Sequence, residues 1–454
     1  MQRPIRRVLI ANRGEIAVRV NRTCRDLGIE TVQVYSQADR DSLAVRLADR
    51  AVCIGAARSS ESYLDQAVLV RAAKAFKADA IHPGYGFLSE NAQFAALCAN
   101  EGLNWIGPGA DVIRLMGNKA AARQAAVNAG LNTTPGSTGT VRDWKEAALV
   151  GESIGFPLIL KASSGGGGRG MRLVTSGADM QDAFMQAQRE ALSAFGDGSL
   201  YVEKFLSRVR HVEVQVLGDE ATTLHLGERD CSTQRRNQKL VEESPGAGLF
   251  PKLRQDMCDA ATRLARSVGY TSAGTVEFIL DEEAQKFYFM EMNTRIQVEH
   301  PVTEMVTGID LVGSQLRIAA GEGVGVEQQD IVSRGHSIEC RINAEDPANH
   351  FRPCPGTIAA LLCPGGPGIR VDTHVFQGYT IPPFYDSLIA KLIAWGADRH
   401  TAINRMQRAL GEMRIEGVKT TISFHQKLLQ DPTFREGRMY TSYVEHGFPL
   451  LVES

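Results

Sequence analysis

The sequence has no long hydrophobic run. Its amino-terminal apolar stretch, VLIA, is followed at once by Asn12, Arg13 and Glu15. A membrane span and the core of a secretory signal peptide both need a longer apolar segment than this. The eight cysteines are scattered and form no C-x-x-C pair, which argues against a secreted disulfide framework. We therefore predict a cytoplasmic protein with reduced thiols.

The sequence also lacks an excess of charge of one sign. Its 50 basic and 52 acidic side chains leave a formal net charge of −2. No overall field then attracts nucleic acid or an anionic membrane, so we expect neither as a partner. Internal repeats and low-complexity segments are missing as well. Any recognition of a charged ligand must come from a local cluster of residues.

The length of 454 residues favours two or three domains. Near the amino terminus, helical stretches alternate with the apolar strands RRVLIA, TVQVYS, DAIHP and NWIG. This alternation is typical of βαβ units in a parallel sheet. Ligands of such sheets usually bind at the carboxyl ends of the strands.

The pattern changes after Lys119. A helix is expected near 119–129, and the strand FPLILKAS runs into a glycine run. A helix over 179–195 and the strand LYVEKFL complete a small α+β module. From residue 209 on, VRHVEVQVL, TTLHLGE, GTVEFIL and KFYFMEMN have the alternation of antiparallel strands. The fold class predicted is α/β and α+β, with several domains.

The glycine run spans Gly165–Gly168 and continues at Gly170. Glycines let several backbone N–H groups approach phosphate oxygens because no Cβ is in the way. The G-K-[ST] sequence of a Walker loop is absent. Lys161, just before the run, favours phosphate binding, because an ammonium group neutralises nucleotide charge. A flexible surface loop explains the glycines alone equally well.

Two strands carry a carboxylate within apolar sequence. Glu277 interrupts GTVEFIL, and Glu291 interrupts FYFMEMN, where Asn293 follows. Carboxylate and amide oxygens are hard ligands that suit Mg²⁺ bound together with ATP phosphates. The alternative is a pair of solvated strand faces. We favour the metal site because solvated faces seldom have such apolar neighbours.

Strand alternation assigns faces within FYFMEMNTR. Glu291, Asn293 and Arg295 are expected on one face, and Met290 and Met292 on the other. This would direct three polar side chains toward one ligand.

The run Arg295-Ile-Gln-Val-Glu-His300 combines a cation with a carboxylate, and Lys239 and Arg341 add cations elsewhere. A small oxyanion substrate needs such cations for charge neutralisation and a base to remove a proton. Spacing along the chain does not show whether these side chains meet in space.

The strand VRHVEVQVL places His211, Glu213 and Gln215 on one face. A polar surface ladder and a wall of a ligand site both fit this pattern. The residues alone leave the choice open.

Taken together, these motifs resemble the biotin carboxylase family of the ATP-grasp superfamily over nearly the whole chain. The matching stretches are IANRGEIAVR, AIHPGYGFLSEN, GPGADVIRLMGNK, KASSGGGGRGMR, VEKFL, RHVEVQV, GERDCSTQRRNQK, EMNTRIQVEHPVTEM, ECRINAED and YDSLIAKLI. The resemblance implies an N-terminal Rossmann-like domain over 1–115 and an ATP-grasp domain over 116–330, with a mobile glycine-rich lid at about 132–204. A C-terminal mixed-sheet domain over 331–454 would follow.

The resemblance also implies a role for each matching residue. The residues implied for ATP are Lys119, Lys161, Gly165, Gly166, Gly167, Gly168, Glu203, Lys204, Leu206, His211, Gln234 and Asn237. Those implied for the metal are Glu277, Glu291 and Asn293. Those implied for bicarbonate are Lys239, Arg295, Gln297, Val298 and Glu299, and for biotin Tyr85, Gly86 and Arg341. Catalysis is expected from Glu299, Arg341, Lys239 and Arg295.

The implied activity is ATP-dependent carboxylation of biotin with bicarbonate, with ATP, Mg²⁺ or Mn²⁺, and carrier-bound biotin. Glu299 would deprotonate bicarbonate, whose attack on ATP gives carboxyphosphate and ADP. Carboxyphosphate would break down to CO₂ and phosphate, the phosphate would take the proton of the biotin nitrogen, and Arg341 would offset charge on the ureido oxygen.

No A-M-K-M biotin-attachment sequence is present. We therefore expect biotin to arrive on a separate carrier protein, with a carboxyltransferase subunit as a further partner. By resemblance the chain is expected to form a homodimer and to serve acetyl-CoA carboxylase, in fatty acid biosynthesis, or a related acyl-CoA carboxylase.

Three positions depart from the family pattern. Asn237 stands where His is common, Asn118 replaces an Asp, and Ser164 takes the first place of a glycine run. They keep one alternative open, a nucleotide-binding paralogue of low activity. A second alternative is another ATP-grasp carboxylate–amine ligase, but that class would lack RIQVEH and HPGYGFLSEN.

Overall fold

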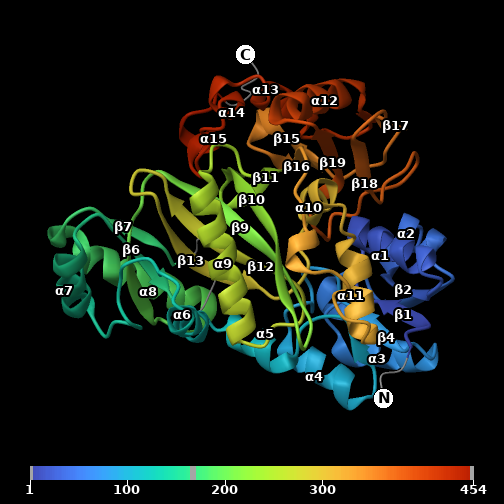
Figure 1. Cartoon of the computed structure of the whole chain (residues 1–454), viewed down its shortest axis with the longest axis horizontal. Helices are drawn as coiled ribbons and strands as arrows, with labels where there is room; N and C mark the ends of the chain where they lie inside the picture. Colours follow the sequence, from blue (N-terminus) through green and yellow to red (C-terminus); the bar gives the residue numbers. More distant parts are fainter. Residues whose placement is uncertain (1–3, 164–169, 450–454) are drawn as a thin grey trace.

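The computed structural model describes residues 4–163 and 170–449. Its first sheet contains five strands, all parallel, in the order β3-β2-β1-β4-β5 (Figure 1). This confirms the predicted parallel sheet. The strands are β1 (Arg7–Ile10), β2 (Glu30–Ser36), β3 (Arg50–Gly55), β4 (Ala80–His82) and β5 (Asn104–Trp105), and the connecting helices are α1 (Gly14–Asp26), α2 (Leu43–Leu47), α3 (Gln66–Ala75) and α4 (Ala92–Asn100).

The direction in which successive strands are added to this sheet changes between β1 and β4. At this point, hydrogen bonds connect the loop after β1 to the loop after β4. Asn12 donates from Nδ2 to the carbonyl of Pro83 at 2.6 Å and to that of Tyr85 at 2.7 Å. Gly84 has a φ of +62°, and a Cβ at this position would lie 2.8 Å from Asn12 Nδ2. The turn therefore requires glycine, and it places Tyr85 at the switch point where parallel sheets bind ligands.

The small module is a three-stranded antiparallel sheet in the order β7-β6-β8. Apolar residues of its strands and helices form one buried cluster. The elements are β6 (Leu158–Ala162), β7 (Arg172–Val174), β8 (Leu200–Lys204), α7 (Trp144–Ile154) and α8 (Met180–Phe195). Two helices, α5 (Ala110–Gly117) and α6 (Lys119–Asn128), precede the module. The predicted strands and helices are present here.

The largest sheet has eight antiparallel strands in the order β13-β12-β9-β10-β11-β14-β19-β18. It is continuous across residue 331, where we predicted a domain boundary. The strands are β9 (Val209–Gly218), β10 (Thr223–Arg235), β11 (Gln238–Ser244), β12 (Ser272–Asp281), β13 (Lys286–Asn293), β14 (His336–Asn343), β18 (Ile369–Thr373) and β19 (Leu388–Gly396).

One face of this sheet is apolar and lies beneath helices. Val212, Val214 and Val216 of β9 pack in one cluster with residues of α9 (Pro251–Ser267). Ile338 and Cys340 of β14 pack in another cluster with α12 (Arg399–Glu412). Each buried aliphatic side chain contributes about 1.5–3 kcal/mol. Since side chains alternate along a strand, the residues between these positions point to the opposite face.

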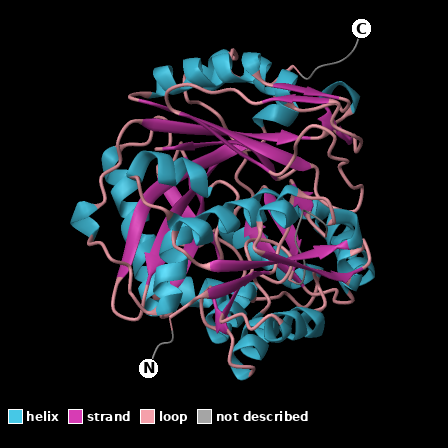
Figure 2. Cartoon of the chain, turned by 90° about the vertical axis from the view of Figure 1, so that its right-hand side faces the viewer, coloured by secondary structure: helices cyan, strands magenta, loops and turns pink. Residues whose placement is uncertain are grey.

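Two helices, α10 (His300–Thr307) and α11 (Leu311–Ala320), connect the sheet to the first domain, because α11 packs in the same apolar cluster as α1. Figure 2 shows the strands lying between layers of helices. The remaining elements are β15 (Glu345–Asp346), β16 (Arg352–Pro353), β17 (Ala360–Leu362), β20 (Arg414–Glu416), α13 (Ile422–Leu428), α14 (Pro432–Arg435), α15 (Tyr443–His446) and the short 3-10 helices η1 (Gln37–Asp39), η2 (Ser59–Glu61), η3 (Gly177–Asp179), η4 (Gln328–Asp330) and η5 (Pro347–Asn349).

The faces predicted for β13 were partly wrong. Met292 is 3% exposed, but Met290 is 38% exposed and so does not share its buried face. The pairing with β12 shifts between Glu277, opposite Glu291, and Phe278, opposite Phe289. Met290 is the extra residue of this β-bulge, which interrupts the alternation of faces.

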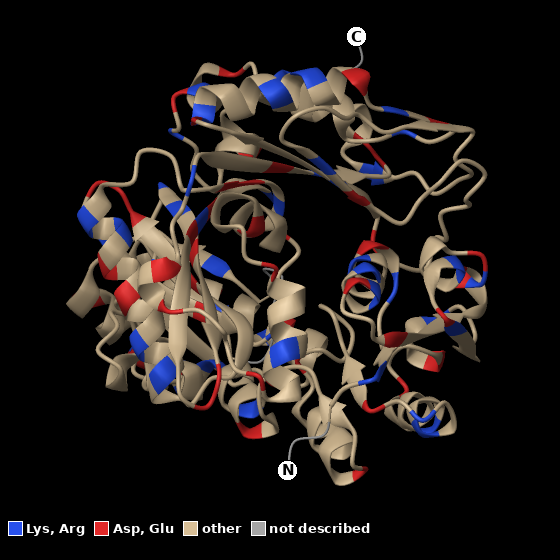
Figure 3. Cartoon of the chain, turned by 45° about the vertical axis from the view of Figure 1, so that its right-hand side comes forward, with Lys and Arg blue, Asp and Glu red and all other residues tan. Residues whose placement is uncertain are grey.

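None of the helices in the described part of the chain is both long and apolar enough to cross a membrane. Basic and acidic residues are interspersed along the outer helices (Figure 3). The net charge is therefore close to zero because basic and acidic residues are interspersed over the surface, and not because charged residues are few.

Candidate active site

The polar face of the eight-stranded sheet carries a charged cluster around Lys239. Its Nζ lies 2.6 Å from Glu213 Oε2, 3.0 Å from Glu277 Oε1 and 2.7 Å from Glu299 Oε1. Burial by itself would lower the pKa of Lys239, but the three carboxylates outweigh it and raise the pKa well above its ordinary value. Lys239 is therefore a permanent cation at the centre of the cluster.

Glu299 lies at the end of the loop before α10 and is fully buried. Its second oxygen, Oε2, accepts a hydrogen bond of 2.9 Å from Arg341 Nη2. Burial would raise the pKa of Glu299, but Lys239, Arg341 and Arg229 together hold it well below its ordinary value. The carboxylate is ionised at neutral pH, as a general base has to be before it accepts a proton.

Arg341 on β14 joins Glu299 to a second buried carboxylate. Its Nε donates to Glu242 Oε1 at 2.6 Å. Burial raises the pKa of Glu242 to about 7, although Arg341 lowers it. Arg341 also lies directly opposite Lys391 of β19 in the sheet register. The guanidinium group is thus fixed by two carboxylates from different segments.

A buried arginine, Arg229, holds Glu213 of the cluster in place. Arg229 Nε donates to Glu213 Oε1 at 2.6 Å, and its Nη1 donates to Gln215 at 2.7 Å and to Thr303 at 2.9 Å. Both Arg229 and Glu213 are fully buried. Glu213 is thereby held by a cation on each oxygen, which offsets the cost of burying it. The face of His211, Glu213 and Gln215 is therefore part of the site rather than a surface ladder.

The loop 294–299 carries the remaining residues predicted for bicarbonate. Arg295 donates from Nε to Glu90 at 3.0 Å and from Nη1 to Gln297 Oε1 at 2.9 Å. Gln297 in turn donates from Nε2 to Glu277 Oε1 at 2.8 Å. The carbonyl oxygen of Val298 accepts a hydrogen bond from Lys391 Nζ at 2.8 Å. The loop is thus attached to the charged cluster through Gln297 and Glu299, and to β19 through Val298.

The residues predicted for the metal lie on neighbouring strands. Glu277 and Glu291 are register partners on β12 and β13, and Glu277 Oε2 lies 3.1 Å from His211 Nε2. Asn293 Oδ1 accepts a hydrogen bond of 2.8 Å from Arg295. Within residues 4–163 and 170–449, the exposed carboxylate of Glu291 has no hydrogen bond or ion pair. Two carboxylates and one amide oxygen at this place fit a hard divalent cation such as Mg²⁺.

Two residues predicted for ATP form ion pairs in the small module. Lys161 Nζ pairs with Glu203, which also pairs with Arg123 at 3.2 Å. Lys204 donates to the carbonyl oxygens of Gly155 at 3.0 Å and Phe156 at 2.8 Å. The ammonium of Lys204 therefore holds the turn before β6. Gly165, Gly166, Gly167 and Gly168, predicted to bind phosphate, lie outside the described residues.

The other residues predicted for ATP are spread along the site. His211 Nδ1 and Gln234 Nε2 lie 2.8 Å apart, Lys119 begins α6 after the cap Asn118, and Leu206 is half-buried in the loop after β8. Asn237 lies at the exposed two-residue turn between β10 and β11, with a φ of +62°. Asn tolerates this left-handed conformation, which explains its use in the hairpin turn.

Two of the residues predicted for biotin lie in the loop after β4, and the third, Arg341, is on β14. The Tyr85 hydroxyl donates a hydrogen bond to Glu15, and Gly86 is exposed with a φ of +67°. Arg341 lowers the pKa of Tyr85 but does not outweigh burial, which raises it well above its ordinary value. Through Glu15, Tyr85 is connected to Lys391, the register partner of Arg341.

Sequence reasoning missed several charged residues of the site. A charge within an apolar strand was the signal for two of them: Lys391 lies in LIAKLIAW, and Glu339 lies in SIECRI, two residues before Arg341. Both are fully buried. The residues missed are Glu15, Glu90, Arg229, Glu242, Glu339 and Lys391.

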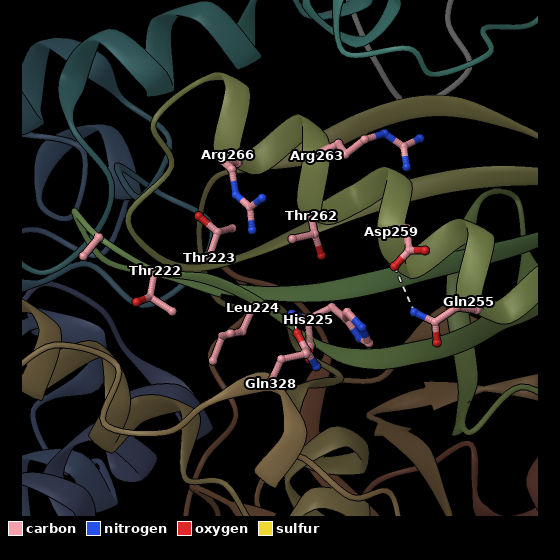
Figure 4. A pocket seen from close by; sticks show the side chains of 11 residues that line it. Thr222, Thr223, Leu224, His225, Gln255, Asp259, Thr262, Arg263, Arg266 and Gln328 are labelled. Carbon is pink, nitrogen blue, oxygen red and sulfur yellow. Dashed lines mark hydrogen bonds between the residues drawn. The ribbon is translucent and has the colours of Figure 1, made fainter.

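A cavity of about 540 Å³ lies elsewhere, between α9, the turn joining β9 to β10, and Gln328 (Figure 4). Arg263, Arg266 and Thr262 line it from the helix, and His225 from the strand. None of its lining residues is among the predicted site residues. The cavity is therefore separate from the charged cluster.

Three families match successive parts of the chain: "Biotin carboxylase, N-terminal domain" over 4–113, "Carbamoyl-phosphate synthase L chain, ATP binding domain" over 118–326 and "Biotin carboxylase C-terminal domain" over 339–446. A biotin carboxylase of Nostoc sp. is 55% identical over 97% of this chain and 98% of its own length.

Two solved structures are similar to the whole chain. Biotin carboxylase of Campylobacter jejuni, in a β,γ-ATP complex, has a TM-score of 0.93 and 47% identity over 97% of this chain and 98% of its own. The biotin carboxylase domain dimer of 2-oxoglutarate carboxylase from Hydrogenobacter thermophilus, in complex with MgADP, ADP and bicarbonate, has a TM-score of 0.93 and 49% identity over 98% of both chains.

Proposed function

This chain belongs to the biotin carboxylase family, and from that premise we propose that the charged cluster carboxylates biotin with bicarbonate and ATP. The observation that carries the proposal is the position of Glu299, whose two oxygens contact Lys239 and Arg341. An ionised carboxylate beside two cations offers charge neutralisation for one oxyanion and a means to remove its proton.

In the first step, bicarbonate binds among Lys239, Arg295, Gln297 and the Val298 segment. Its negative charge beside Glu299 raises the pKa of that carboxylate and so makes it a stronger base. Glu299 takes the proton, and the bicarbonate oxygen attacks the γ-phosphate of ATP to give carboxyphosphate and ADP. Cations around the site stabilise the transferred charge, as phosphoryl transfer requires.

Mg²⁺ or Mn²⁺, when bound by Glu277, Glu291 and Asn293, would supply charge neutralisation for the ATP phosphates. Glu277 would do this while it also accepts hydrogen bonds from Lys239 and Gln297. The metal residues and the bicarbonate residues therefore share one carboxylate. This sharing keeps the nucleotide and the oxyanion next to each other.

In the second step, carboxyphosphate breaks down to CO₂ and phosphate, and the phosphate takes the proton from the biotin nitrogen. Negative charge then develops on the ureido oxygen, and Arg341 offsets it. Tyr85 and Gly86 contact the ring of biotin from the loop after β4. The nitrogen attacks CO₂, and carboxybiotin results.

The remaining residues implied for ATP, including Lys119, Lys161, His211 and Gln234, bind the nucleotide.

Biotin arrives on a separate carrier protein, a carboxyltransferase subunit uses the carboxybiotin, and the chain acts as a homodimer in the cytoplasm. The final acceptor meets the carboxyltransferase and not this chain, so acetyl-CoA, as in fatty acid biosynthesis, another acyl-CoA, pyruvate and urea all fit this function. The chain divides into domains at 1–115, 116–330 and 331–454, close to the limits of the three matching families, and the second and third domains share the eight-stranded sheet.

The function is tested by phosphate release from ATP with bicarbonate, with and without free biotin. We expect release to depend on bicarbonate and to rise with biotin. An amine that replaces biotin as the stimulating substrate would support a carboxylate–amine ligase instead. ATP binding without turnover under all conditions would support a nucleotide-binding paralogue.

Replacing Glu291 with Gln is expected to lower the turnover of MgATP by about 100-fold, because a metal ligand that neutralises phosphate charge is worth several kcal/mol. The melting temperature should not change, since the exposed Glu291 side chain has no hydrogen bond in the described residues. Initial rates measured against Mg²⁺ concentration test this. Glu283→Gln, on the exposed turn of the same hairpin, is the matched control and should behave as wild type.

A further inference from the structure

Lys391 is a charged residue of the site for which the mechanism above has no role. It lies in the middle of β19, in the apolar segment LIAKLIAW, and its side chain is fully buried. A buried ammonium group is costly unless it is paired and hydrogen-bonded. The contacts that Lys391 makes therefore explain why a lysine is at this position.

Lys391 Nζ contacts two segments that are far apart in the sequence. It lies 3.1 Å from Glu15 Oε1, in the first turn of α1, and it donates to the carbonyl oxygen of Val298 at 2.8 Å. Asp372 is more distant, at 4.0 Å, and is paired with Arg370 at 2.7 Å. Glu15 is thus the ion-pair partner of Lys391.

Glu15 extends this contact to a third segment. It is also buried, and it accepts the hydrogen bond from the Tyr85 hydroxyl. The contacts form one chain, in which Tyr85 donates to Glu15, Glu15 pairs with Lys391, and Lys391 donates to the Val298 carbonyl. We call this chain the Lys391 link.

The Lys391 link joins the two substrate sides of the site. Tyr85 is in the loop proposed to contact biotin, and Val298 is in the loop proposed to bind bicarbonate. Arg341, proposed to act on biotin, is the register partner of Lys391 on the neighbouring strand. Neither loop holds Tyr85 or Val298 in this way through its own residues, because the link is made from α1 and β19.

We propose that Lys391 is a positioning residue, which with Glu15 fixes the biotin loop relative to the bicarbonate loop. This inference rests on the proposed function, because it assigns no new chemistry. Transfer of CO₂ to the biotin nitrogen requires the two reactants at near-contact distance. A misplacement of 1 Å lowers the rate by about 100-fold, so a rigid link between the loops has a direct effect on turnover.

Lys391→Met tests the inference in the purified full-length chain. We expect kcat/KM for biotin to fall by about 100-fold and KM for bicarbonate to rise. KM for ATP should stay within about twofold of wild type, since Lys391 contacts none of the residues proposed to bind the nucleotide. If the lysine only stabilised the fold, the variant would lose active enzyme and kcat, while all three KM values would stay unchanged.

The double variant Glu15→Gln/Lys391→Met separates positioning from stability. The single variant leaves Glu15 as a buried carboxylate without its cation, and the second change removes that charge. We expect the melting temperature to recover relative to the single variant, whereas the defects in KM for biotin and bicarbonate persist. Recovery of both KM values in the double variant would overturn the inference.

Arg399→Met is the matched control. Arg399 pairs with the buried Glu243 at 2.7 Å, on the opposite face of the sheet from the site. This variant should lower the melting temperature and leave every KM unchanged.

Wild-type enzyme without any stimulation by biotin would mean that the proposed function fails. Stimulated wild type together with a Lys391→Met variant of unchanged KM values would refute the positioning role alone.

Discussion

Replacing Glu299 with Gln is expected to lower bicarbonate-dependent ATP cleavage by about 10³-fold, within the range of rate losses for a missing general base. The amide has nearly the same size but does not accept the proton of bicarbonate. Phosphate release in the presence of bicarbonate measures the loss. Titration calorimetry with ADP should give an affinity close to that of wild type, because Glu299 is not among the residues proposed for the nucleotide.

The control for this variant is Glu243→Gln. Glu243 is also a buried glutamate of the same sheet, but it faces away from the site and pairs with Arg399 and His336. Burial would raise the pKa of Glu243, but the Arg399 guanidinium and the hydrogen bond with His336 hold it at about 2. The change should therefore reduce stability rather than turnover. Unchanged turnover in Glu299→Gln would remove Glu299 from the role of base.

Replacing Arg341 with Ala is expected to reduce biotin carboxylation by about 10²–10³-fold, the range measured when a group that stabilises developing negative charge is removed. The variant also leaves Glu242 and Glu299 without a shared cation. Glu242, whose pKa burial already raises to about 7, should then take up a proton at neutral pH. Carboxybiotin formation and the melting temperature measure the two effects.

ATP binding should survive in Arg341→Ala, since the guanidinium contacts Glu242 and Glu299 but no residue proposed for the nucleotide. Arg254→Ala is the matched control, because Arg254 pairs with the buried Glu228 at 2.6 Å and belongs to α9, on the other face of the sheet. Its biotin carboxylation should equal that of wild type. A collapse of nucleotide affinity in Arg341→Ala would show that this arginine was assigned to the wrong substrate.

Local patterns in the sequence predicted the elements well. Alternation identified β9, β10, β12 and β13, and apolar strands alternating with helices predicted the parallel sheet. The prediction failed at Met290, because this residue is the extra one of a β-bulge in the pairing of β13 with β12. The sequence of one strand does not specify how that strand pairs with its neighbour. The same limit applied to His211, Glu213 and Gln215, whose pattern fits a solvated face as well as a buried one.

The sequence by itself determined the chemistry of the site, because the types of residue and their motifs are local properties: a glycine run, two acidic strands and the RIQVEH segment. Only the tertiary structure decided which of these side chains form ion pairs with one another. Glu213, Lys239, Glu277, Glu299 and Arg341 meet because five segments adopt one antiparallel register and one loop conformation. Pairing between distant strands depends on the packing of the whole chain, so no single segment specifies it.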